Sequence, residues 1–87
     1  MDARARSELL KKISCQGFSI EDYGSRLILR PRGAENSAAI TVEENDEEGW
    51  KVIRAEGKYT GFARGYKQTY FENNLNLWAV QARLQLP

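Results

Sequence analysis

Four short strand-like segments, separated only by turn residues, limit what the middle of this chain can fold into. Apolar residues in these segments alternate with polar ones or form brief runs of strand length. The segments are residues 18–20, 26–30, 39–44 and 50–55. Turn-forming residues at 22–25 and an acidic segment at 45–49 connect neighbouring strands over short distances. Because short connections pair neighbouring strands in opposite directions, the sequence predicts an antiparallel meander.

A helical pattern precedes the strands. Within residues 3–14, Leu9, Leu10 and Ile13 form one apolar edge, and charged residues occupy the other faces. Cys15, the only cysteine, follows this segment directly. We expect its side chain to be small and buried at the end of the helix.

The C-terminal region fits two patterns. Thr69 and Glu72 have the spacing of a capping box, which is typical of a helix start. Apolar residues then recur with helical spacing, at Phe71, Leu75, Trp78, Ala82 and Leu86. Residues 78–86 also alternate strictly, as a strand would. We favour the helix because Leu, Ala, Gln and Arg are good helix formers and only Val80 is β-branched.

These patterns together predict an α+β fold. The expected architecture is an antiparallel four- to five-stranded meander sheet with an N-terminal and a C-terminal helix packed on one face. The fifth strand would be short and lie near residues 59–64. Residues 1–87 are expected to form a single small domain, because the chain is too short for two separate cores.

Composition narrows the range of functions. The chain has no histidine and one cysteine, so it lacks the usual proton shuttle near neutral pH and any internal disulfide. An enzyme of this composition would depend on carboxylates, lysine or tyrosine alone, and we expect neither a cofactor nor a metal. The net charge is +1 and no apolar run reaches membrane-spanning length. Without disulfides, a small domain is most typical of a reducing compartment, so we expect a cytoplasmic protein with no membrane attachment.

Residues 57–71 form the most unusual stretch of the sequence. They hold five of the nine aromatic residues, three glycines and three cations, and no acid. Rings and cations of one sign suit contact with an anionic or stackable partner. The candidate partner-binding residues are therefore Lys58, Tyr59, Arg64, Tyr66 and Lys67. The same rings could instead pack in the core, and the sequence leaves that alternative open.

A second candidate contact region is acidic. Its residues are Glu43, Glu44, Asp46, Glu47 and Glu48. Glu44, Asp46 and Glu48 stand at positions one, three and five of a calcium-binding loop, but position one is not Asp and the closing position falls on Ala55. The sequence therefore predicts no calcium site, and the segment is either a solvated turn or a contact loop.

We expect this chain to be a non-enzymatic small protein-binding module. It could act as a regulator, inhibitor or assembly subunit, a type common among proteins of phage and mobile elements. An alternative is a nucleic-acid-binding domain that uses the basic and aromatic stretch 57–67, although residues 43–48 oppose the field that nucleic acid requires. A small enzyme without histidine is the third hypothesis.

Overall fold

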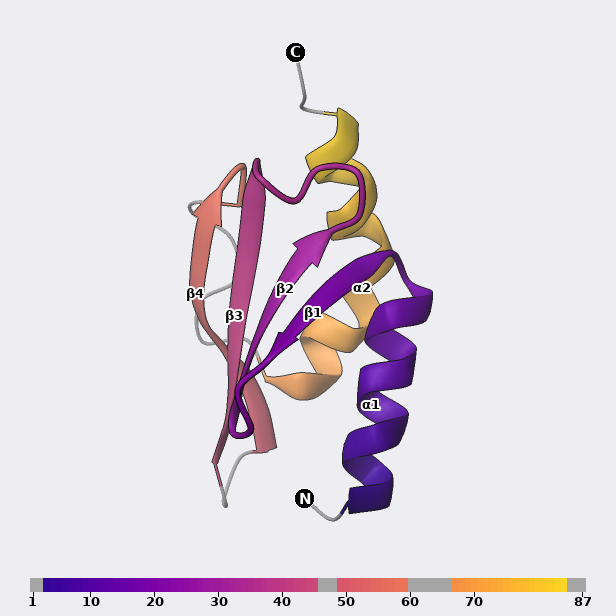
Figure 1. Cartoon of the computed structure of the whole chain (residues 1–87), viewed down its shortest axis with the longest axis vertical. Coiled ribbons are helices and arrows are strands. Elements are labelled where there is room, and N and C mark those ends of the chain that lie inside the picture. Colours follow the sequence, from indigo (N-terminus) through magenta and orange to yellow (C-terminus); the bar gives the residue numbers. More distant parts are fainter. Residues whose placement is uncertain (1–2, 46–48, 60–66, 85–87) are drawn as a thin grey trace.

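The computed structural model describes residues 3–45, 49–59 and 67–84. Its elements are α1 (Ala3–Cys15), β1 (Phe18–Asp22), β2 (Arg26–Pro31), β3 (Ala38–Asn45), β4 (Gly49–Gly57) and α2 (Gln68–Leu84). The four strands form one antiparallel sheet in the order β1-β2-β3-β4, and both helices lie on the same side of it (Figure 1). The predicted α+β meander with terminal helices is confirmed.

A single apolar core lies between the sheet and the helices. In β2, Leu27 and Leu29 are fully buried, whereas Ile28 between them is only half-buried, as the twofold period of a strand requires. Cross-strand pairing continues the buried rows, with Leu27 opposite Val42 and Leu29 opposite Ile40. The helices complete the core with these buried residues: Leu9, Ile13, Phe71, Leu75, Trp78, Ala79 and Ala82. Each large apolar side chain buried here stabilises the fold by about 1.5–3 kcal/mol.

A β-bulge alters the expected alternation of β4. Thr41 pairs with Arg54, but the next residue of β3, Val42, pairs with Val52, so Ile53 is the extra residue. Simple alternation after Val52 would direct Arg54 into the core. The bulge instead leaves Arg54 exposed and places Ala55 against the core.

The C-terminal region is a helix, as favoured from its composition. It begins at Gln68, two residues earlier than a capping box with Thr69 as its N-cap implies. The carbonyl of Lys67 accepts hydrogen bonds from the amides of Tyr70 and Phe71, at 3.0 and 3.2 Å. Lys67 therefore occupies the N-cap position, and Thr69 is an exposed residue of the first turn. The capping box at Thr69 was a wrong prediction.

Two further predictions need correction or fall outside the described residues. Cys15 is exposed at the end of α1, so the expectation that it is buried is wrong. Tyr59, the first residue of the predicted fifth strand, lies in the turn after β4, and residues 60–66 lie outside the described ranges. Beyond them, Lys67 forms an isolated antiparallel bridge with Lys51 of β4.

Gly57 offers a test of the turn after β4. Its φ is +63°, and a Cβ at this position would lie 2.1 Å from the carbonyl oxygen of Ser37. Gly57→Ala is therefore expected to lower the free energy of unfolding by about 1–3 kcal/mol beyond the cost of the positive φ alone. Gly24→Ala is the matched control, because Gly24 has a φ of +87° and open space around it. Its expected cost is about 1–2 kcal/mol. Equal costs for the two variants in urea unfolding would contradict the close approach at Ser37.

Tyr59 tests the contact between this turn and α2. Its ring is fully buried, and its hydroxyl donates a hydrogen bond to the carbonyl oxygen of Trp78. Tyr59→Phe is expected to cost about 0.5–1.5 kcal/mol, and Tyr59→Ala about 3–5 kcal/mol. Tyr70→Ala, at a 48 % exposed site, should change the stability by less than about 0.5 kcal/mol. Thermal and urea unfolding measure all three, and a Tyr59→Ala protein as stable as Tyr70→Ala would contradict the core assignment.

Candidate interaction surface

The turn between β1 and β2 is held in one conformation by its own hydrogen bonds. The amide of Tyr23 donates to the carbonyl of Arg26 at 2.9 Å, which closes the turn. The amide of Gly24 donates to Oδ1 of Asp22, also at 2.9 Å. Gly24 has a φ of +87°, a conformation that glycine adopts without steric cost. The carbonyl of Ser25 in turn accepts a hydrogen bond from the amide of Glu44, which ties the turn to β3.

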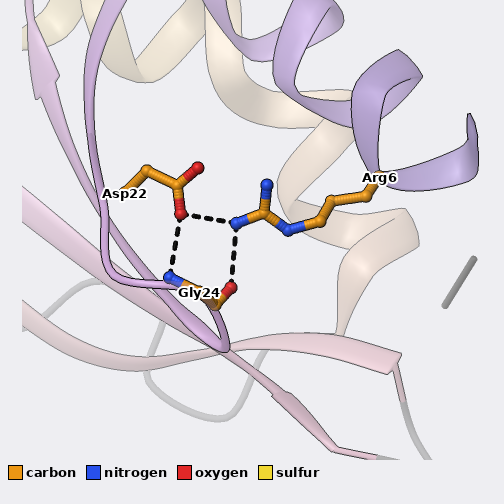
Figure 2. A network of polar contacts seen from close by, with 3 residues as sticks. All are labelled: Arg6, Asp22 and Gly24. Atoms are coloured by element: carbon orange, nitrogen blue, oxygen red, sulfur yellow. Dashed lines mark hydrogen bonds and ion pairs between the residues drawn. The ribbon is translucent and has the colours of Figure 1, made fainter. Parts of the chain in front are cut away.

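A side chain from α1 fastens the same turn to the helix layer (Figure 2). Nη2 of Arg6 lies 2.5 Å from Oδ1 of Asp22 and 2.9 Å from the carbonyl oxygen of Gly24. The hydrogen bond from Arg6, followed by that from the Gly24 amide, holds the pKa of Asp22 below its usual value. The same hydrogen bond to Asp22 raises the pKa of Arg6. The guanidinium also lies 6.0 Å from the centre of the Trp50 ring. Arg6 of α1 therefore contacts both β1 and β4, the two edge strands of the sheet.

Beside this turn, the face of the sheet away from the helices carries a shallow open depression of about 470 Å³. We call this face the outer face. The residues that line the depression form the hairpin surface: Tyr23, Ser25, Arg26, Ile28 and Glu43. Tyr23 is 63 % exposed, which makes it the most exposed large apolar side chain of the described residues. Because the turn is anchored on three sides, the Tyr23 ring projects from a fixed backbone.

An exposed ion pair forms one wall of the hairpin surface. Nη2 and Nε of Arg26 lie 2.7 and 3.2 Å from the same carboxylate oxygen of Glu43. Their side chains are 54 % and 40 % exposed, so water screens the pair and its contribution to stability is small. Both charges are consequently available to groups of another molecule. Tyrosine and arginine are among the residues that contribute most of the binding energy at protein interfaces.

The described candidates of the basic and aromatic stretch are Lys58, Tyr59 and Lys67, and these three do not form one surface. Tyr59 is a core residue whose ring is fully buried, so the prediction that this ring contacts a partner is wrong. Lys58 is exposed in the turn after β4, and Lys67 is exposed beside Lys51. Arg64 and Tyr66 lie outside the described residues, so their role stays a prediction.

The two acidic candidates among the described residues lie on opposite faces of the sheet. Glu43 lies on the outer face and pairs with Arg26, which makes it the one predicted site residue that belongs to the hairpin surface. Glu44 is half-buried on the opposite face, where its charge contributes to the raised pKa of Arg6. Asp46, Glu47 and Glu48 lie outside the described ranges.

The other residues of the hairpin surface were not predicted as site residues. Residues 22–25 were taken only as turn formers, and residues 26–30 as an apolar strand. The signal was nevertheless present. Strict alternation within residues 26–30 puts Ile28 on the same face as Arg26 and Arg30, opposite Leu27 and Leu29. This pattern could have identified Ile28 as an aliphatic side chain among charges, but that inference was not drawn.

Comparisons with known proteins returned no match of significance. A scan against protein-family models, a search of curated proteins and a search of solved structures each gave none. Within the described ranges, no group of three or more His, Cys, Asp or Glu residues is placed to hold a metal ion. Neither of the described helices has the length and apolar character needed to cross a membrane.

The acid dependence of stability tests the contact between Arg6 and Asp22. Because the folded pKa of Asp22 lies below its usual value near 3.8, its contribution to stability is complete above that pH. The contribution is lost as the pH falls through the lower folded value. We therefore expect the stability difference between the wild type and Asp22→Asn to be largest near neutral pH and to shrink below about pH 4.

Urea unfolding between neutral pH and about pH 2 measures this difference. Glu35→Gln is the control, because the amide of Gly33 lowers the pKa of Glu35 through a separate hydrogen bond. That variant should keep the Asp22 contribution unchanged. If the free energies of unfolding of the wild type and Asp22→Asn changed in parallel between neutral pH and about pH 2, the contact between Arg6 and Asp22 would not stabilise the fold.

Proposed function

We propose that this chain is a non-enzymatic protein-binding module that contacts its partner through the hairpin surface. The observation that carries the proposal is the exposed Tyr23 ring beside Arg26 and Ile28 at an open depression. Tyrosine offers a large amphipathic area with few rotatable bonds, and arginine offers several hydrogen-bond donors. A module of this kind would act as a regulator, an inhibitor or an assembly subunit by occupying a surface of another protein.

The rigidity of the turn supports a binding role for Tyr23. Association is weakened when loops and side chains must be ordered at the interface. The contacts of Arg6, Asp22 and Gly24 have already ordered this turn in the free protein. Tyr23 can therefore enter a partner's pocket with little further loss of backbone freedom.

The mixed charges of the outer face favour a protein partner over a polyanion. Three arginines of the described outer face each pair with a glutamate, in the pairs Arg26–Glu43, Arg30–Glu21 and Arg54–Glu56. A nucleic acid would meet these carboxylates together with the guanidinium groups and be repelled by them. A protein surface with charges of both signs can match the pattern residue by residue.

Capture from a native lysate with matched variants tests the proposal. The immobilised wild type should retain a discrete protein, and Tyr23→Ala and Arg26→Ala should each reduce its retention about tenfold or more, since truncation at a hot spot costs about 2 kcal/mol or more. Arg4→Ala is the control, because it also removes an exposed arginine paired with a glutamate, on α1. The proposal fails if the two hairpin variants retain the same proteins as the wild type in the same amounts.

Titration with mixed oligonucleotides distinguishes the alternative function. Nucleic-acid binding through Lys58 and Lys67 should weaken steeply as salt rises and should decrease in Lys58→Gln and Lys67→Gln. We expect no binding by the wild type at moderate salt. Tight, salt-dependent binding that Tyr23→Ala leaves intact would favour the nucleic-acid hypothesis instead.

A further inference from the structure

The side of α2 that faces away from the sheet carries large apolar residues among uncharged polar ones. The opposite side of this helix packs into the core through Phe71, Leu75 and Trp78. On the outward side, Tyr70, Leu77 and Val80 are 48 %, 51 % and 37 % exposed. Together with Tyr23 they are the exposed large apolar residues of the described chain. Three of these four residues therefore lie along one helix.

The spacing of these residues is that of a helix-packing seam. Tyr70, Asn73, Leu77 and Val80 follow one another at intervals of three, four and three residues. Alternation of three and four keeps side chains on one line along a helix and is the repeat by which two helices pack together. We call these four residues the α2 seam. Asn73, the polar member, carries an amide that both donates and accepts hydrogen bonds.

The α2 seam also lies on a side without charge. From Asn73 to Ala82 the sequence has no acidic or basic residue, although 29 % of the whole chain is charged. The one charged residue among Gln68–Ala82 is Glu72, which pairs with Lys12 of α1 at 3.4 Å and so belongs to the side of α2 that meets α1. Depletion of charge around exposed apolar and aromatic residues is typical of the centre of a protein interface.

We propose that the α2 seam binds the α2 seam of a second copy of this chain across a twofold axis. In such a dimer each surface must be complementary to itself. An uncharged seam meets its copy without repulsion between like charges, and its repeat of three and four residues matches the same repeat on the other helix. Within α2, the amide of Asn73 can pair with an amide because it supplies both donors and acceptors.

The dimer would leave the hairpin surface free. The seam lies on the side of α2 opposite the sheet, whereas the hairpin surface lies on the outer face of the sheet, beyond the core. Two hairpin surfaces would then be presented by one particle. The helix of 17 residues is about 25 Å long, so the contact is small and the dimer should dissociate on dilution.

Sedimentation equilibrium of the full chain, over roughly 10 µM to 1 mM, tests this proposal. The mass of the wild type should rise with concentration from the monomer value of 9.9 kDa towards twice that value. Leu77→Asp, which puts like charges face to face, should remain a monomer throughout. Lys11→Asp, an exposed change on α1, should associate as the wild type does. A wild type that stays at 9.9 kDa, or a Leu77→Asp protein that dimerises equally well, overturns the proposal.

A cross-linking measurement covers the case in which Leu77→Asp unfolds. Leu77→Cys in a Cys15→Ser background leaves one thiol, placed on the seam. Mild oxidation should convert this protein to a covalent dimer faster than a matched Arg4→Cys, Cys15→Ser protein at the same concentration. Equal rates of dimer formation for the two proteins would contradict the seam as the interface.

Discussion

The structure depends on the covering of one sheet face by two helices that come from opposite ends of the sequence. Alone, the meander would leave Leu29, Ile40 and Val52 in water, and a sheet with one bare apolar face is not stable. The helices cover that face with stripes that include Ile13 and Phe71. Each helix needs the sheet in turn, because isolated helices of this length are marginal in water. Among the described residues, the outer face of the sheet and the outward sides of α1 and α2 therefore lie outside the core.

The sequence predicts the elements of this fold well, because each has a local pattern. Alternation and turn residues identify the strands, and the apolar spacing of α2 outweighs the competing strand pattern. The departures have causes that local patterns do not carry. Ile53 becomes a bulge residue through pairing with β3. Lys67, the N-cap of α2, also forms the bridge to Lys51 of β4, a contact between residues distant in the sequence. A cysteine side chain is small enough for either a buried or an exposed position, so the residue type alone did not determine the exposure of Cys15.

The candidate site could be predicted much less well, because composition does not tell which way a ring points. Tyr59 and Tyr23 have the same side chain and both lie in turns. The hydroxyl of Tyr59 meets a carbonyl of α2, which fixes the ring in the core. Tyr23 is exposed on a turn that is anchored by the hydrogen bond between Arg6 of α1 and Asp22. These two residues are 16 positions apart in the sequence. Contacts over such separations decide which of the two rings is exposed, and Glu43 is the described acidic candidate that also lines the hairpin surface.

The order of the strands has a consequence for the kinetics of folding. Every pair of neighbours in the sheet is also adjacent in the sequence, so each hairpin can close through a short loop. The two helices face the opposite situation. The contacts of Lys12 with Glu72 and of Gln16 with Asn76 each span 60 residues. The largest loss of chain entropy therefore accompanies the packing of α1 against α2. If the hairpins form first, they shorten the stretch of flexible chain between the two helices and so reduce this loss.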